Sequence, residues 1–430
     1  MKISIFWARR DLRIEDNTAL FKALSSGKKV LPIFIFDENI VNELPSNDSR
    51  ISFIYSTLKE LNNQLKKYDS SFFILKGNPI EVWKELIKKF DIAEVYINKD
   101  YEPYGIQRDA SILSLLEANK ITLHSYKDQV IFEEKEIVKN DGKPYTIFTP
   151  YKNKWLYHFQ QKNIDIQDEV SYSSFHTFNY QFPSITELGF QYSEIKIQPF
   201  NLSKADNYSE NRNIPSLDAT SYLSPHLRFG TVSIRQIIRK LKPENEVFLS
   251  ELIWREFFMQ ILFNFPKVIQ ENFKPKYNHI DWRNNKTEFE KWCKGKTGYP
   301  LVDAGMRQLN KTGYMHNRVR MVTAGFLCKH LLINWQWGEA YFAEKLLDYE
   351  LSSNNGNWQW ASGTGCDAAP YFRIFNPIEQ LKKFDNKHIY VKEWIPELET
   401  TSYPQPIVDH KFARIRALER YKNGIEKYTF

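Results

Sequence analysis

The spacing of apolar residues changes once along this chain, and that change restricts how the chain can fold. Over the first 130 residues, short continuous apolar runs alternate with amphipathic patterns of helical period. The apolar runs lie at 3–8, 29–36, 71–77 and 93–99, and the helical patterns lie at 16–24, 50–68, 79–90 and 105–120. Strands without a polar face are buried on both sides, as in a parallel sheet covered by helices. This part is therefore predicted to be an α/β domain with a Rossmann-like parallel sheet.

The rest of the chain shows no such alternation. Residues 131–199 lose the periodicity and are rich in Ser, Gln, Asn and Tyr, which predicts a long interdomain linker over the surface. From residue 200 to residue 430 the apolar patterns have the period of a helix, so this domain is predicted to be all-helical. No GxGxxG follows the first apolar run, so a dinucleotide site of the usual kind is not indicated there.

Charge and aromatic content give weaker indications. The formal net charge of +7 favours a nucleic-acid partner only slightly, and ordinary solubilising surface charge explains it equally well. Eight of the 11 tryptophans lie between Trp254 and Trp394. Most buried rings belong to cores, but this density favours a site that stacks flat molecules.

Cysteine usage and the N-terminus indicate the compartment. The three cysteines have no CxxC spacing, which fits a reducing cytosol and argues against a disulfide framework or a cysteine zinc site. The histidines form no HxxxH pair, so no metal site is predicted. Charged residues follow the N-terminus too soon for the apolar segment of a signal peptide, and no apolar run has membrane-spanning length. The chain is predicted to be cytoplasmic, without a membrane partner.

Two helical segments carry side chains suited to a flat ligand. In ELIWREFF, Glu251, Trp254 and Arg255 share one helical face, which suits stacking a base and hydrogen-bonding its edge. A solvated Glu–Arg helix pair is the equally ordinary alternative. In GYMHNRVRM, Arg318 and Arg320 lie on opposite flanks, so that one can meet a phosphate while the other faces inward.

Three further segments are compatible with more than one interpretation. TSYLSPHLRFG (220–230) is a hydroxyl-rich turn before a helix that opens near Thr231, either a phosphate cradle or an N-cap. LLDYELSSNN (346–355) contains two carboxylates, which suggest acid–base work or an exposed helix end. NNGNWQWASGTG (354–365) combines turn residues with two large rings. Together these patterns predict an aromatic, polar, partly basic pocket, but they do not name its ligand.

Five segments resemble motifs of the cryptochrome/photolyase family in order and spacing. They are RRDLRIEDN, TSYLSPHLRFG, ELIWREFF, KTGYPLVDAGMRQLNKTGYMHNRVRM and NNGNWQWASGTGCDAAPYFRIFNP. The match covers nearly the whole chain and is most similar to the class I branch, which repairs cyclobutane pyrimidine dimers (CPDs). The resemblance implies an α/β antenna domain, a linker and an all-α FAD-binding domain. It also implies light-driven electron transfer from reduced, anionic FAD to a dimer flipped out of UV-damaged DNA, ring splitting, and return of the electron.

The resemblance assigns residues to the cofactor. The FAD-binding residues would be Tyr208, Thr220, Ser221, Leu223, Ser224, Phe248, Arg255, Asn317, Arg320, Asp348, Glu350 and Asn354. Arg320 and Asp348 would form an ion pair beside the isoalloxazine, and Asn354 would face its N5 atom. Trp358 and Trp360 can face different ligands if the backbone turns between them, and the preceding Asn and Gly residues would then lie close to the cofactor.

The resemblance also assigns the lesion pocket, the DNA contacts and an electron path. Glu251 would hydrogen-bond the dimer, and Trp254 and Trp360 would be the pocket walls. The DNA and substrate set is Arg212, Glu251, Trp254, Arg255, Asn317, Arg318, Met321, Trp360, Arg373 and Gln380. Trp358, Trp335 and Trp282 would be the family's three-tryptophan chain from flavin to surface.

Several positions depart from the family pattern. Glu350 stands where Asp is common, Phe248 replaces a frequent Trp, and Tyr222 replaces an Arg in the phosphate turn. Tyr104 and Gly105 stand where folate-binding members carry an Asn–Glu pair. The second antenna chromophore is therefore left open among folate, deazaflavin, flavin and none.

The family contains other activities, which the same residues discriminate. A (6-4) photolyase would carry histidines at Asn317 and Met321, and a signalling cryptochrome would lose Trp254 and Trp360 and carry Asp or Cys at Asn354. A single-strand-preferring DASH-type member fits MHNRVRM less well. The expected protein is thus a monomeric CPD photolyase acting on UV-damaged DNA.

Overall fold

The computed structural model describes residues 2–161, 166 and 171–428, and the chain forms two compact units that interleave along the sequence. The first unit comprises Met1–Glu136, Leu156–Phe200 and Tyr222–Leu241. The second unit comprises Ile137–Trp155, Asn201–Ser221 and Lys242–Phe430.

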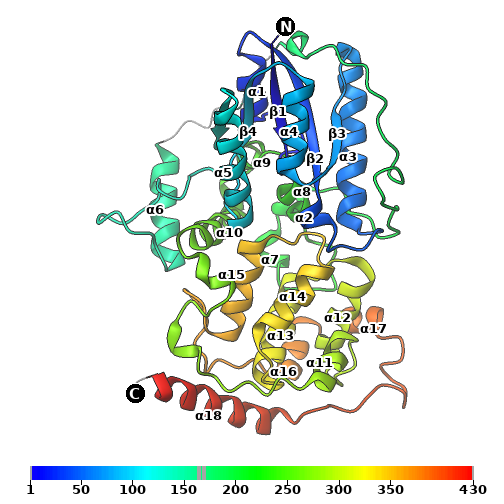
Figure 1. Ribbon diagram of the computed structural model, residues 1–430. Coiled ribbons are helices and arrows are strands. Elements are labelled where there is room, and N and C mark those ends of the chain that lie inside the picture. The colour runs from blue at the N-terminus through cyan, green and yellow to red at the C-terminus, as the bar shows by residue number, and fades with distance from the viewer. Residues whose placement is uncertain (1, 162–165, 167–170, 429–430) are drawn as a thin grey trace. The chain divides into compact units, whose positions relative to one another are not determined.

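A parallel five-stranded sheet forms the centre of the first unit (Figure 1). Its strands are β1 (Ile3–Ala8), β2 (Lys29–Asp37), β3 (Phe73–Gly77), β4 (Ile92–Asn98) and β5 (Thr122–Tyr126). Their order is β3-β2-β1-β4-β5, and every pair is parallel. The four predicted strands and the parallel sheet are confirmed. The first four strands are apolar because helices cover both faces of the sheet.

The fifth strand was not predicted. β5 pairs only with β4, at the edge of the sheet, and its residues are exposed or partly buried. Because its side chains are exposed or only partly buried, Thr-Leu-His-Ser-Tyr lacks the apolar run that marks the other strands.

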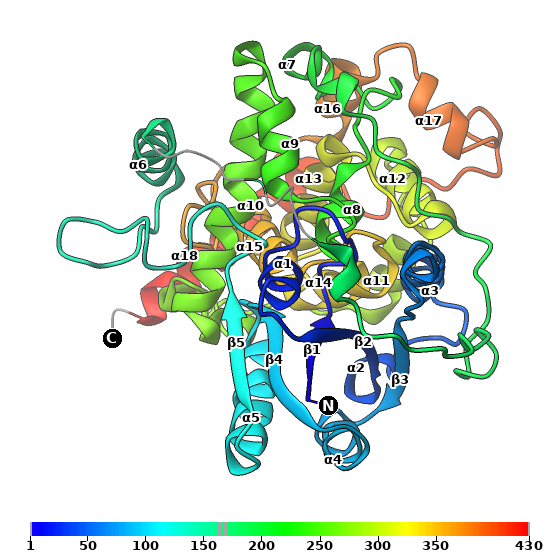
Figure 2. The same cartoon turned by 90° about the horizontal axis from the view of Figure 1, so that it is seen from above.

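Helices cover the two faces of the sheet with separate cores, as Figure 2 shows. The helices that pack here are α1 (Thr18–Leu24), α3 (Ser49–Leu65), α4 (Pro79–Lys89) and α5 (Pro103–Ala118). Residues of α1 and α3 share one hydrophobic cluster with the sheet, and residues of α4 and α5 share the other. The short α2 (Glu38–Val41) follows β2, and α8 (Leu223–Phe229) and α9 (Ile234–Lys240) complete the unit.

The second unit is built from helices, and no strand occurs among its described residues. Its helices are α7 (Tyr208–Asn211), α10 (Glu246–Asn264), α11 (Lys286–Cys293), α12 (Pro300–Thr312), α13 (Asn317–Gly325), α14 (Trp335–Lys345), α15 (Leu351–Ser362), α16 (Pro377–Phe384), α17 (Ile389–Trp394) and α18 (His410–Tyr428). Helix α13 continues into a π-helical turn at Phe326–His330. The all-helical prediction is confirmed. Across the described residues, no helix is both long and apolar enough to cross a membrane.

One helix lies inside the range predicted to be irregular. Helix α6 (Phe148–Gln160) buries Phe148, Tyr151 and Trp155, which lie at helical spacing on one face. The prediction of irregular structure is wrong over this stretch. The polar residues on both sides of it hid the single buried face.

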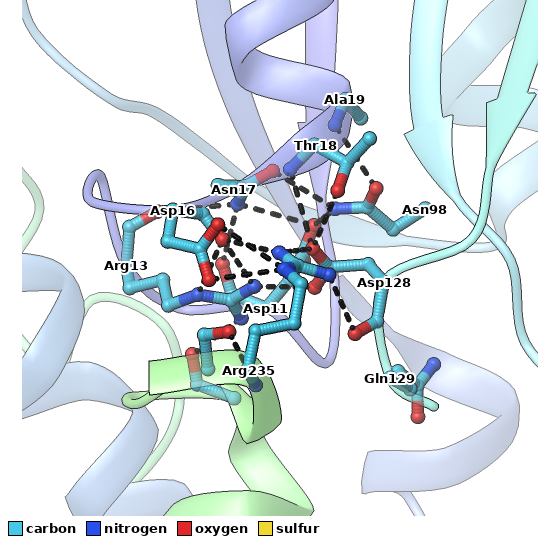
Figure 3. Close-up of polar contacts among 12 residues, drawn as sticks. Asp11, Arg13, Asp16, Asn17, Thr18, Ala19, Asn98, Asp128, Gln129 and Arg235 are labelled. Atoms are coloured by element: carbon cyan, nitrogen blue, oxygen red, sulfur yellow. Dashed lines mark hydrogen bonds and ion pairs between the residues drawn. The ribbon is translucent and has the colours of Figure 1, made fainter. Parts of the chain in front are cut away.

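A buried ion network holds the α8–α9 segment to the sheet within the first unit (Figure 3). Asp128 pairs with Arg13 at 2.5 Å and with Arg235 at 2.8 Å, and Arg235 also pairs with Asp16 at 3.0 Å. Arg13 further donates to the backbone oxygen of Gly230 at 3.1 Å. Burial opposes ionisation of Asp128, but the two arginines outweigh it and hold the pKa of Asp128 below its ordinary value. The RRDLRIEDN segment is thus a structural anchor.

Replacing Asp128 should destabilise the first unit strongly. Asp128→Ala leaves two buried guanidinium groups short of a counter-charge, which costs about 3 to 5 kcal/mol of unfolding free energy. Denaturant unfolding followed by circular dichroism measures the loss. The matched control is Asp141→Ala at an exposed carboxylate, and equal stabilities of the two variants would contradict the role assigned to the network.

Candidate functional site

One group of predicted site residues lies where α7 meets the first turns of α10. The Tyr208 ring packs edge-on against Phe248, with centroids 5.2 Å apart. Glu251 forms an ion pair with Arg212 at 2.7 Å, and the Arg212 guanidinium lies 5.3 Å from the centre of the Tyr208 ring. Burial raises the pKa of Glu251, although Arg212 opposes the shift. Burial, reinforced by Glu251, raises the pKa of Tyr208 to about 12.

The same corner is electropositive. Arg318 of α13 donates to Asn213 Oδ1 at 2.7 Å, and its guanidinium lies 4.4 Å from the centre of the Phe384 ring. Burial, together with repulsion from Arg212 and Arg373, lowers the pKa of Arg318. Arg212 and Arg373, the other two arginines predicted to hold a DNA backbone, are therefore close enough to act on Arg318. Their combined field favours phosphate groups.

Trp254 lies one helical turn after Glu251 on α10 and is half-buried. Its ring stacks on the Phe148 ring of α6, with centroids 3.7 Å apart and planes within 9°. Arg255 follows it on α10 and is also half-buried. One face of the predicted lesion wall is thus covered by the protein itself.

The remaining predicted substrate residues lie on α15, on α16 and on the segment between these helices. Trp360 is half-buried near the end of α15, and Arg373 is exposed in the segment that follows. Gln380 is half-buried on α16, and its Oε1 atom has no hydrogen-bond partner among the described residues.

The ion pair expected between Arg320 and Asp348 is present, with Arg320 on α13 and Asp348 between α14 and α15. Arg320 donates to Asp348 Oδ1 at 3.2 Å and to Oδ2 at 3.0 Å, in a fork-like geometry. A further bond from Arg320 Nε to the Met315 backbone oxygen, at 2.8 Å, fixes the guanidinium plane. Asn317 and Met321 lie one turn apart on the same helix. The placement of these residues beside a flavin remains a prediction.

Two further cofactor candidates are positioned by α14 and α15. Glu350 is the N-cap of α15, and its buried carboxylate accepts from the Ser352 hydroxyl at 2.6 Å and the Ser353 N–H at 2.9 Å. Asn354 Nδ2 donates to the backbone oxygen of Glu339 in α14 at 3.1 Å. This bond does not use Asn354 Oδ1, so the oxygen is the atom suited to a donor on a ligand.

The segment that holds both site tryptophans of α15 is helical throughout. Between Trp358 and Trp360 the backbone turns as part of α15, which runs unbroken from Leu351 to Ser362. Residues two apart on a helix project about 200° from one another, so the helix itself separates the two rings. Trp358 is 2% exposed and packs into the core, whereas Trp360 is half-buried.

Two glycines allow this helix to approach its neighbours closely. A Cβ added at Gly356 would lie 2.1 Å from the Phe258 ring of α10, and one added at Gly338 of α14 would lie 2.1 Å from the Trp358 ring. Close approach was expected for the Asn and Gly residues of this segment. Gly356 supplies it between helices, against an aromatic ring.

The three tryptophans predicted to form an electron path share one environment. Trp358 and Trp335 are each 2% exposed in the same hydrophobic cluster, and the partly buried Trp282 packs against that cluster. Trp335 Nε1 donates to Asn272 Oδ1 at 2.9 Å. Burial thus decreases from Trp358 toward Trp282, as a path that ends at the surface requires. Their role in electron transfer remains a prediction.

Residues predicted to hold the diphosphate are divided between the units, with Thr220 and Ser221 in the second and Leu223 and Ser224 in the first. Tyr222 between them has the left-handed conformation, with φ of 54°. The helix expected to open near Thr231 is α9, which begins at Ile234, and the segment predicted to be a turn before it contains the short helix α8.

The antenna positions in the first unit are satisfied by the protein's own groups. The Tyr104 hydroxyl donates to Asp37 Oδ2 at 2.5 Å, and burial together with this bond raises the pKa of Tyr104 to about 12. A Cβ added at Gly105 would lie 2.6 Å from Asp100. Neither position offers the carboxylate expected for a folate chromophore. The choice among folate, deazaflavin, flavin and no second chromophore therefore stays as the sequence left it.

Three residues at this site were missed in the sequence. Phe148 stacks on Trp254, Asp367 binds the Phe148 N–H, and Glu339 binds Asn354 and Asn355. The helical spacing of Phe148, Tyr151 and Trp155 was the available signal for the first. No sequence pattern marks the other two, because their partners are distant along the chain.

Comparison with known proteins gives matches over both parts of the chain. The family models described as DNA photolyase and as the FAD binding domain of DNA photolyase match residues 4–169 and 248–402. The deoxyribodipyrimidine photo-lyase of Vibrio cholerae is 34% identical over 465 residues, covering 98% of this chain and 99% of the relative. That of Escherichia coli is 33% identical over 468 residues, covering 98% and 99%.

Two solved structures are similar over nearly their whole length. A bacterial class III photolyase from Agrobacterium tumefaciens has 31% identity and a TM-score of 0.87, covering 99% of this chain and 98% of the other. An archaeal photolyase from Sulfolobus tokodaii with two FAD molecules has 34% identity and a TM-score of 0.86, covering 98% and 99%.

Glu339 should make stability depend on pH. Burial raises its pKa from the ordinary 4.5 to about 7, against the opposing bond from Asn355. The folded state therefore holds the proton more tightly, and stability falls as the pH rises from about 4.5 to about 7. Glu339→Gln should remove this fall, which thermal unfolding at a series of pH values measures.

The matched control for this prediction is Glu344→Gln, at an exposed carboxylate of the same helix. The Glu344→Gln protein should keep the pH profile of the unmodified protein. Identical profiles for the two variants would contradict the prediction.

Proposed function

This chain belongs to the cryptochrome/photolyase family, and from that membership we propose that it is a deoxyribodipyrimidine photo-lyase, which repairs cyclobutane pyrimidine dimers in DNA. The corner of α7 and α10 carries the proposal, because the carboxylate of Glu251 is paired there with Arg212, which also acts on Arg318, and Trp254 follows Glu251 by one turn on α10. Such a set matches two linked pyrimidine bases of one strand and the phosphates beside them.

FAD is the cofactor, and the residues of the matched FAD-binding region fit its chemistry. The Arg320–Asp348 pair offers a charged edge, Phe248 offers an apolar ring, and Asn354 Oδ1 offers an acceptor. When bound and reduced, FAD supplies the light-driven electron that splits the dimer. The side chains of this chain bind and orient the cofactor.

The lesion is proposed to lie against Trp254 and Trp360, with Glu251 at the base edges. Burial raises the pKa of Glu251 and Arg212 opposes that shift, and the carboxyl is suited to hydrogen-bond the base edges of the dimer. Arg212 holds that carboxyl in place at 2.7 Å. Taking the dimer out of the stack costs a few kcal/mol, least for a distorted lesion, and ring stacking offsets this cost.

The photolyase class and the oligomeric state of this chain are further parts of the proposal. We place the chain in class I, on Asn317 and Met321 and on the MHNRVRM segment, although a class III structure is also similar. We propose that it acts as a monomer in the cytoplasm. Separating class I from class III requires a tree built from many family sequences.

Repair of dimers is the direct test of the function. Illuminating the reduced, FAD-loaded protein with dimer-containing DNA should restore thymine absorbance. Glu251→Ala should lower the repair rate by roughly tenfold, because a hydrogen bond to a charged group contributes about 1.5 kcal/mol. Lesion binding should weaken only modestly.

The control for this test is Glu244→Ala, at an exposed carboxylate just before α10. This variant should repair at the unmodified rate. If the loaded, reduced protein restores no thymine absorbance, the assignment as a photolyase fails.

The tryptophan path predicts a separation of two activities. Trp358→Phe should slow light-driven reduction of oxidised FAD, because phenylalanine is far harder to oxidise, while repair by chemically reduced protein stays largely intact. Flavin absorbance under illumination measures the first activity and thymine recovery the second. The control is Trp394→Phe, since Trp394 Nε1 has no hydrogen-bond partner among the described residues. Equal loss of both activities in Trp358→Phe would refute the path.

A further inference from the structure

The stack of Phe148 on Trp254 joins the start of α6 to the predicted lesion wall. Phe148 is 6% exposed, and its ring lies 3.7 Å from the Trp254 ring with the planes within 9°. Isolated aromatic pairs prefer an offset or edge-on arrangement over a face-to-face stack. The surrounding contacts must therefore hold these two rings in register.

Those contacts reach both rings. Phe257 of α10 packs edge-on against Phe148 at 5.8 Å and against Trp254 at 5.5 Å. The Phe148 N–H donates to Asp367 Oδ2 at 3.0 Å. Two turns further along the buried face of α6, Trp155 Nε1 donates to Glu256 Oε1 at 2.7 Å. Helix α6 is thus bonded to α10 on one side and to the segment after α15 on the other.

This arrangement limits how Trp254 can meet a ligand. Phe148 covers one face of the indole, and Phe258 packs against it at 5.3 Å with planes tilted by 32°. The indole plane cannot rotate without breaking the stack with Phe148. A flat base can therefore use only the part of Trp254 that the stack leaves open.

We propose that Phe148 is a positioning residue that sets specificity for the dimer by locking the plane of Trp254. The proposal rests on the proposed function, in which Trp254 is a wall of the lesion pocket. Phe148 does not touch the dimer; it acts through Trp254. The Asp367 bond adds a link to the segment that carries Arg373, so the start of α6 joins the lesion wall to a predicted DNA contact.

The test measures binding in the dark to two matched oligonucleotides, one with a single thymine dimer and one undamaged. Phe148→Leu removes the stacking plate but keeps an apolar side chain. The ratio of the Kd for undamaged DNA to the Kd for dimer-containing DNA should fall by about tenfold, since an aromatic pair contributes up to about 1.5 kcal/mol. Phe148→Tyr retains the ring and should restore the ratio.

Two controls separate this role from general stability. Tyr157→Leu removes an exposed ring from the same helix and should leave the ratio unchanged. Light-driven FAD reduction should be unaffected in Phe148→Leu, because the stack is not part of the tryptophan path. If Phe148→Leu does not fold, Asp367→Ala loosens the start of α6 while keeping both rings and should lower the ratio by a smaller factor.

The outcomes are distinguishable. A wild-type protein that does not prefer the dimer overturns the proposed function itself. A wild-type protein that prefers the dimer, with Phe148→Leu unchanged in ratio, overturns the role of Phe148. Equal weakening toward both oligonucleotides, or failure of Phe148→Tyr to restore the ratio, also overturns it, because a merely structural role would act on both DNAs alike.

Discussion

The close packing of α15 between α10 and α14 is the contact on which the site depends. Gly356 admits the Phe258 ring of α10, and Gly338 of α14 admits the Trp358 ring, where any larger residue would collide. Interiors are packed as densely as organic crystals, so an added methyl group would have to move a helix or a large ring. These two glycines therefore keep α10, with the predicted lesion contacts Glu251 and Trp254, and α14, with Glu339, at fixed spacing from Asn354.

Polar groups at the site are held by protein partners before any ligand binds. Arg212 holds Glu251, the Glu339 backbone oxygen holds Asn354, and Asp348 holds Arg320. A buried polar group without a partner costs free energy, and a mobile one must be ordered during binding. Preorganisation of this kind leaves defined atoms, such as Asn354 Oδ1, for the cofactor and the lesion. It also explains why Glu350 caps α15, since a fixed helix start fixes Asn354 one turn later.

The RRDLRIEDN motif near the N-terminus has a structural role. Arg13 and Asp16 of RRDLRIEDN are committed to Asp128 and Arg235, and removing any partner would leave a buried charge. Through Arg235 and Gly230 the network secures α8, whose first residues are the predicted diphosphate contacts Leu223 and Ser224. A motif near one end of the chain thereby positions residues more than 200 positions later.

The periodicity of apolar residues was enough to predict the α/β and helical halves, because burial on two faces or on one stripe leaves a periodic pattern along the chain. It did not show β5, whose exposed and partly buried side chains leave no apolar run, or α6, whose buried face is framed by polar residues. Motif resemblance selected candidates such as Glu251 and Asn354, since their identities and spacing are local. Their partners, Arg212 and Glu339, and the stack of Phe148 on Trp254 are seen only in the folded structure. Those contacts join residues distant in sequence, and no local periodicity records which distant side chains meet.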